Sequence, residues 1–151
     1  MSSPRILTLC FVALLVVGCS FVETTPPPPT PADFGDTVTR FVTRGIRIDH
    51  VVSGDAGCSD KVLAPTAIAF DASGLDQATP VRIYLYRFAD RATFERLRAT
   101  VDACARTYVA DPNTYQSIEQ SPYVLSGQGP WGQSFEVALR AGLLEAAGTG
   151  G

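Results

Sequence analysis

The chain has 151 residues, 46% of them hydrophobic, which is enough apolar material for one globular domain with its own core and too little length for a second domain. Its formal net charge of -3 supplies no basic surface of the kind that binds phosphate backbones. We therefore expect no nucleic acid partner.

The N-terminus has the pattern of an export signal. Arg5 precedes an apolar run from Ile6 to Val17. This run is too short for a membrane-spanning helix, which needs about 20 apolar residues. The run ends in Val16-Val17-Gly18-Cys19, which resembles the lipobox of bacterial lipoprotein signal peptides. The resemblance covers only the first nineteen residues. It implies that residues 1–18 are removed and that Cys19 becomes the acylated first residue of the mature protein.

That resemblance places the protein at the extracytoplasmic face of a bacterial membrane, with membrane lipid as its partner through Cys19. Two alternatives stay open at this stage. The apolar run is an uncleaved membrane helix, or it is an ordinary secretory signal and Cys19 is incidental.

Residues 19–32 are predicted to be a tether. Prolines occupy positions 26 to 29 and position 31, and consecutive prolines favour an extended polyproline II conformation of about 3.1 Å per residue. A proline-rich recognition motif is the alternative. A single globular domain is then expected over residues 33–147, with a flexible tail over 148–151.

Apolar spacing predicts a helix, three strands and a loop in the first half of this domain. The strand Val81–Phe88 is apolar on both faces, with Ile83 on one and Tyr84 on the other, so it should be central in a sheet. The remaining elements are a helix from Asp33 to about Gly45, a strand that starts at Ile46 and runs until Ser53-Gly54, a loop from Ser53 to Ala64, a strand over Thr66–Phe70 and a turn at Ser73-Gly74.

The second half is predicted to hold two helices and a short strand. The helix Asp90–Val109 has an apolar stripe that includes Cys104, while its charged residues Arg91, Glu95, Arg98 and Asp102 are expected to face water. A strand is predicted at Tyr123–Leu125 and a last helix over Gln133–Ala146. The fold class is therefore α+β, a small and mainly antiparallel sheet with two or three packed helices.

The cysteines point to a disulfide. With Cys10 removed in the signal and Cys19 acylated, Cys58 and Cys104 are left in a compartment where disulfides persist. Closing a loop of 104 - 58 = 46 residues stabilises a fold by roughly 4 kcal/mol in the chain-entropy account. Free thiols are the alternative. We predict no metal site, because no C-x-x-C occurs and His50 is the only histidine.

No motif in the sequence indicates a particular catalytic chemistry or a cofactor. The segment Gly127 to Gly132 matches G-x-G-x-x-G, but a dinucleotide fold needs a further strand and an acidic residue about 20 positions later, and Pro130 removes an amide donor. We expect these glycines to form a turn in which Trp131 packs. His50 beside Asp49 is interpreted as a structural residue, and the carboxylates are scattered without a motif.

Aromatic residues near Pro122 are the best candidates for a functional surface. Tyr115, Tyr123 and Trp131 either line a ligand or partner site or fill the core, and the core is the favoured interpretation. The sequence thus predicts a non-catalytic, membrane-anchored domain that binds a small ligand or an envelope protein. The alternative is a small surface hydrolase that uses two carboxylates, which would need a concave aromatic pocket with the carboxylates within about 10 Å of each other.

Overall fold

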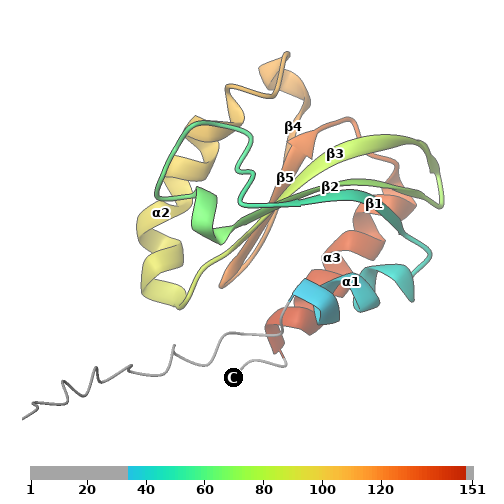
Figure 1. The fold of residues 1–151 in the computed structure, drawn as a ribbon. Coiled ribbons are helices and arrows are strands. Elements are labelled where there is room, and N and C mark those ends of the chain that lie inside the picture. Colours follow the sequence, from blue (N-terminus) through green and yellow to red (C-terminus); the bar gives the residue numbers. More distant parts are fainter. Residues whose placement is uncertain (1–33, 149–151) are drawn as a thin grey trace, which may run out of the picture.

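Five antiparallel strands form the sheet at the centre of the fold, in the order β1-β2-β3-β5-β4 (Figure 1). The computed structural model describes residues 34–148. The strands are β1 (Arg47–Ser53), β2 (Ala67–Gly74), β3 (Gln77–Arg87), β4 (Tyr115–Gln120) and β5 (Tyr123–Gln128). The helices are α1 (Phe34–Val42), α2 (Arg91–Ala105) and α3 (Gln133–Gly148), and two single-turn 3-10 helices are η1 (Ala64–Thr66) and η2 (Pro112–Thr114). The predicted α+β class is confirmed.

Helices α1 and α3 cover one face of the sheet, while α2 and the segment 54–66 cover the other (Figure 1). The two faces of β3 follow the alternation of its side chains. Ile83 and Leu85 are buried on the α1 and α3 side, and Tyr84 and Tyr86 are buried on the α2 side. β3 is the middle strand, as its two apolar faces predicted.

The larger part of the core lies under α3. Four residues on one side of this helix, Phe135, Leu139, Leu143 and Ala146, are fully buried, and they are the four that the helical spacing predicted. They meet buried side chains from α1, from the sheet and from the segment before α3, among them Phe41, Phe70, Leu125 and Trp131. A small core of this kind derives most of its stability from apolar burial.

A second buried cluster lies under α2 and contains the disulfide. Cys58 and Cys104 are bonded, with their Cα atoms 5.5 Å apart, which confirms the predicted pairing. Tyr86 donates a hydrogen bond from its hydroxyl group to the carbonyl oxygen of Ala56 at 2.8 Å, and burial raises the pKa of that hydroxyl above its usual range. The loop that carries Cys58 is thus attached to both the sheet and α2.

A carboxylate from a distant part of the chain defines the start of α3. Asp76, in the turn between β2 and β3, accepts hydrogen bonds from the backbone N–H groups of Ser134 (2.8 Å) and Phe135 (2.9 Å). These bonds satisfy donors that the first turn of a helix leaves free. The bond from Ser134 in particular holds the pKa of Asp76 below its usual value.

Several elements have other bounds than the sequence predicted, and three of the differences affect the turns, the end of α2 and the edge of the sheet. β2 continues through Ser73 and Gly74, so the turn lies at Leu75–Asp76; Gly74 is needed there because a Cβ atom would lie 2.2 Å from the carbonyl oxygen of Gly45. α2 ends at Ala105 rather than Val109. β4 was not predicted at all, and it forms an edge of the sheet.

The N-terminal predictions fall outside the described residues. The signal peptide, Cys19 and the tether all precede position 34, so they stay predictions. Within residues 34–148, no helix combines the length and the hydrophobicity that crossing a bilayer requires.

Candidate functional site

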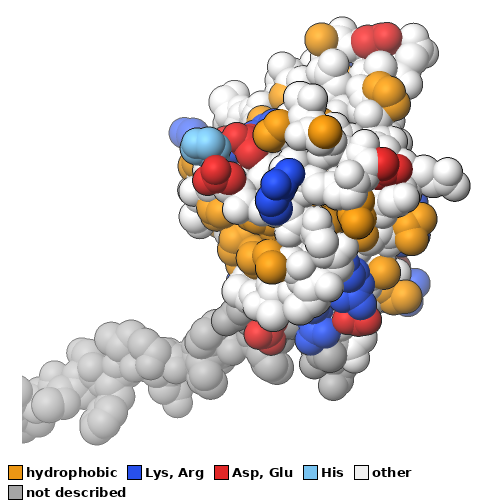
Figure 2. Space-filling model, turned by 90° about the vertical axis from the view of Figure 1, so that its right-hand side faces the viewer, with side chains coloured by type: hydrophobic (Ala, Val, Ile, Leu, Met, Phe, Trp, Pro, Cys, Tyr) orange, Lys and Arg blue, Asp and Glu red, His pale blue; other side chains and the backbone are white. Residues whose placement is uncertain are grey.

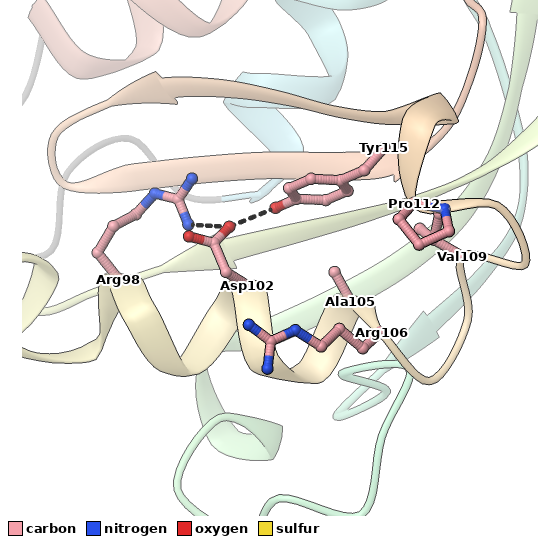
Figure 3. A pocket seen from close by; sticks show the side chains of 7 residues that line it. All are labelled: Arg98, Asp102, Ala105, Arg106, Val109, Pro112 and Tyr115. Atoms are coloured by element: carbon pink, nitrogen blue, oxygen red, sulfur yellow. Dashed lines mark hydrogen bonds and ion pairs between the residues drawn. The ribbon is translucent and has the colours of Figure 1, made fainter.

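A hollow of about 430 Å³ lies between the C-terminal half of α2, η2 and the start of β4 (Figure 3). This volume falls at the lower end of the range for small-molecule pockets, about 300–1,000 Å³. Its apolar lining comes from Ala105, Val109, Pro112 and the ring of Tyr115, and its charged lining from Arg98, Asp102 and Arg106.

Arg98 connects α2 to the edge strand β4. Its guanidinium group donates hydrogen bonds to Asp102 Oδ1 at 2.6 Å and to Ser117 Oγ at 3.2 Å, and it forms an ion pair with Glu119. Burial opposes the charged form, but the bonds to Glu119 and Asp102 outweigh it and raise the pKa of Arg98. The prediction that Arg98 faces water is wrong, because only 18% of its side chain is exposed and its guanidinium group meets Ser117 and Glu119 of β4.

Tyr115 is the aromatic side chain of the hollow. It is half-buried, and its hydroxyl group donates a hydrogen bond to Asp102 Oδ1 at 2.8 Å. Burial, together with the bond to the Asp102 carboxylate, raises the pKa of Tyr115 to about 12. The hydroxyl therefore stays protonated at neutral pH, which suits a positioning role and not that of a base.

The other two aromatic candidates do not lie on a surface. Tyr123 is fully buried and Trp131 is 6% exposed. Trp131 contacts the ring of Phe135 edge-on, with a centroid distance of 6.4 Å, and its indole N–H donates to the carbonyl oxygen of Gln128 at 3.1 Å. The suggestion that Tyr123 and Trp131 line a binding surface is therefore wrong, and the core interpretation holds for both.

The glycine motif around Trp131 serves packing. A Cβ atom at Gly127 would lie 2.7 Å from the carbonyl oxygen of Arg82 and 3.1 Å from the indole ring of Trp131. Only a glycine lets the ring approach β5 so closely. Gly127 belongs to β5, so the expected turn is confined to residues 129–132.

Two carboxylates meet elsewhere, around Arg82 on β3. The guanidinium group of Arg82 contacts Asp71 Oδ1 at 3.2 Å and Asp55 Oδ2 at 3.3 Å. Loss of hydration alone would lower the pKa of Arg82, but the hydrogen bonds to Asp71 and Asp55 outweigh it and raise the pKa. A second hollow of about 300 Å³ adjoins Arg82, and the stacked rings of Tyr84 and Tyr108, 4.2 Å apart, help to line it.

His50 lies on the surface next to this cluster (Figure 2). Its Nδ1 atom is 3.1 Å from Asp71 Oδ2, and its side chain is 73% exposed. The backbone of His50 has a φ of 48° within an irregularity of the β1–β2 pairing. Its ion-pair partners are Asp49 and Asp71, and among the described residues no hydroxyl or thiol group is hydrogen-bonded to the ring as a nucleophile would be.

Residues 34–148 contain no group of three or more histidine, cysteine, aspartate or glutamate side chains placed to hold a metal ion. Comparisons with protein-family models, with curated proteins and with solved structures found no match for this chain. Its function therefore has to be argued from the geometry of these sites.

Sequence reasoning identified one residue of the hollow between α2 and β4, Tyr115, and missed the rest. Arg98 and Asp102 were assigned to a solvent-facing side of α2 because the strand that packs on them was not recognised. The missed signal was the alternation of Tyr115, Ser117 and Glu119 on one face of β4, the face that all three present to α2.

Proposed function

We propose that this protein is a lipid-anchored binding protein of the bacterial cell envelope, whose domain binds a small ligand in the hollow between α2 and β4. The observation that carries the proposal is the composition of that hollow. It combines an apolar floor with a few convergent polar groups, which is the usual form of a small-molecule site.

The groups that line the hollow are held firmly. Asp102 accepts hydrogen bonds from both Arg98 and Tyr115 at one oxygen, so three side chains from α2 and β4 fix one another. A site whose side chains are already ordered loses less conformational entropy when a ligand binds. This rigidity supports recognition, while the protonated hydroxyl of Tyr115 offers no base for catalysis.

The disulfide and the position of the hollow support an anchored protein outside the cytoplasm. Disulfides such as Cys58–Cys104 persist in oxidising compartments. Helix α1, which the predicted tether would precede, lies at the lower end of the domain in Figure 1, and η2 lies at the upper end. A tether ending at Phe34 would leave the hollow directed away from the bilayer.

The carboxylate hydrolase is the weaker proposal. General acid catalysis needs a carboxyl group that carries a proton, whereas Asp55 and Asp71 both accept hydrogen bonds from the same guanidinium group. Neither Asp55 nor Asp71 lines the hollow beside Tyr84 and Tyr108.

Nuclear magnetic resonance of the full chain, held in mild detergent and labelled with ¹³C on its tyrosine rings, tests ligand binding. The chain has five tyrosines, and Tyr115→Phe assigns the signal of interest. A library of small polar-apolar compounds should include some that shift the Tyr115 signal saturably and leave the buried Tyr86 and Tyr123 signals in place. A library that shifts no tyrosine signal would contradict the proposal.

Metabolic labelling tests the anchor. Cys19→Ala should abolish incorporation of labelled fatty acid and release exported protein from the membrane fraction. Cys10→Ala is the matched control, because Cys10 lies inside the predicted signal, and it should change neither property. A Cys19→Ala protein that still incorporates fatty acid would contradict the lipoprotein assignment.

A further inference from the structure

The charges around the α2–β4 hollow balance one another. The two terminal nitrogens of Arg98 are already engaged by Asp102, Ser117 and Glu119, and its Nε atom is buried without a hydrogen-bond partner among the described residues. Arg106 also lines the hollow, and within the described part of the chain it has no ion-pair or hydrogen-bond partner. The positive charges of Arg98 and Arg106 thus balance the negative charges of Asp102 and Glu119. The hollow as a whole therefore attracts neither a simple anion nor a simple cation.

One free positive group and one free negative atom remain. Asp102 uses only Oδ1 for its bonds to Arg98 and Tyr115, which leaves Oδ2 as an open acceptor on a side chain that is 43% exposed. Arg106 is the residue that caps the C-terminal end of α2 and follows Asp102 by four residues, which is about one helical turn, or about 5–6 Å between Cβ atoms. Figure 3 shows the guanidinium group of Arg106 below the Asp102 carboxylate, with no bond drawn between the two side chains.

The apolar floor lies beside this pair of charges. Val109, Pro112 and the ring of Tyr115 offer carbon surface to a ligand, and Ala105 closes the base of the hollow because it is almost fully buried. A matching ligand therefore carries an ammonium group for Asp102 Oδ2, a carboxylate for Arg106 and an apolar group for the floor, all within a few bonds of one another.

We infer that the ligand of this site is a free α-amino acid with an apolar side chain, bound as a zwitterion. The inference rests on the proposed function, and it adds the ligand class. An α-amino acid holds its two opposite charges on one carbon atom, which fits two side chains one helical turn apart. The small volume of the hollow, about 430 Å³, favours such a compact molecule over a large one.

The side-chain network gives each group a separate part. Arg106 binds the carboxylate and Asp102 binds the ammonium group. Tyr115 has a positioning role, because it shares Asp102 Oδ1 with Arg98 and leaves Oδ2 without a hydrogen bond among the described residues. Tyr115 also offers its ring face to the apolar side chain of the ligand.

Isothermal titration of the full chain in mild detergent with three matched probes tests the inference, with titrations into empty micelles subtracted. The probes are L-phenylalanine, 3-phenylpropionate, which lacks the amino group, and 2-phenylethylamine, which lacks the carboxylate. Each charge-assisted contact is worth enough that L-phenylalanine should bind about tenfold more tightly than either analogue.

Variants then separate the two charges. Arg106→Gln should weaken L-phenylalanine and 3-phenylpropionate about tenfold and leave 2-phenylethylamine unchanged. Arg96→Gln is the matched control and should change no affinity, because Arg96 is an exposed arginine of α2 that does not line the hollow. If the charge of Arg106 only stabilised the end of α2, Arg106→Gln would lower the melting temperature without changing the order of the probes, and the inference would be overturned.

The outcomes also distinguish this inference from the proposed function. The zwitterion inference would be overturned if L-phenylalanine and either analogue bound equally well. It would also be overturned if neither L-phenylalanine nor L-leucine bound while other compounds shifted the Tyr115 signal. In both cases the proposed function as a binding protein would stand. Failure of every compound to shift that signal would overturn both.

Discussion

Replacing Trp131 with alanine should destabilise the domain by about 3–5 kcal/mol, the usual range for large-to-small changes in a core. The indole is 94% buried, lies edge-on against Phe135 and donates a hydrogen bond to the carbonyl oxygen of Gln128. A buried tryptophan removes about 150–250 Å² from water. At about 25 cal/mol per Å² this gives about 4–6 kcal/mol, an upper bound because the unfolded chain is itself partly compact.

Circular dichroism is the appropriate assay, because Trp131 is the only tryptophan and its loss removes the fluorescence signal. At about 4 °C per kcal/mol for a domain of this size, the melting midpoint should fall by about 12–20 °C. Val137→Ala is the matched control. Val137 lies on α3 six residues later and is 61% exposed, so its loss should cost less than about 0.5 kcal/mol. A Trp131→Ala protein that melts within about a degree of the wild type would refute the placement of this ring in the core.

Three further predictions follow from the fold and the site. Changing both Cys58 and Cys104 to serine should lower the free energy of unfolding by roughly 4 kcal/mol in denaturant titrations, and an unchanged midpoint would show that the disulfide contributes nothing. Asp76→Ala should lower the melting midpoint at pH 7. Because the fold lowers the pKa of Asp76, the difference in melting midpoint from the wild type should shrink as the pH falls through that lowered pKa. A difference that persists at acid pH would contradict the capping role of Asp76. Tyrosinate absorbance should show one group with a pKa near 12 that is absent in Tyr115→Phe. The free energy of unfolding should fall as the pH rises from 10 to 12, because the Tyr115 hydroxyl loses its proton at a lower pH in the unfolded chain than in the folded one.

The sequence predicted the elements whose apolar pattern is strong. α3 was predicted correctly because Phe135, Leu139 and Leu143 repeat at helical spacing and all three are buried. β3 was recognised as central because both of its faces are apolar. The pairing of Cys58 with Cys104 followed from the number of cysteines left after the predicted export signal, and it did not require the fold.

Contacts between distant segments could not be predicted in the same way. β4 was missed because Ile118 is its one fully buried residue, so its apolar alternation is weak. Asp76 could not be recognised as the cap of α3, because 58 residues separate it from Ser134. The charged lining of the hollow was assigned to solvent for a related reason: Arg98 meets Glu119 only when an edge strand lies beside α2.

The central claim is that the α2–β4 hollow is the ligand site. Intermolecular nuclear Overhauser effects between L-phenylalanine and the full chain, labelled on its methyl groups and tyrosine rings, test it most directly. We expect contacts from the ring of the bound amino acid to the methyl groups of Val109 and to the ring of Tyr115. Contacts only to Tyr84 and Tyr108, which line the other aromatic hollow, would contradict it.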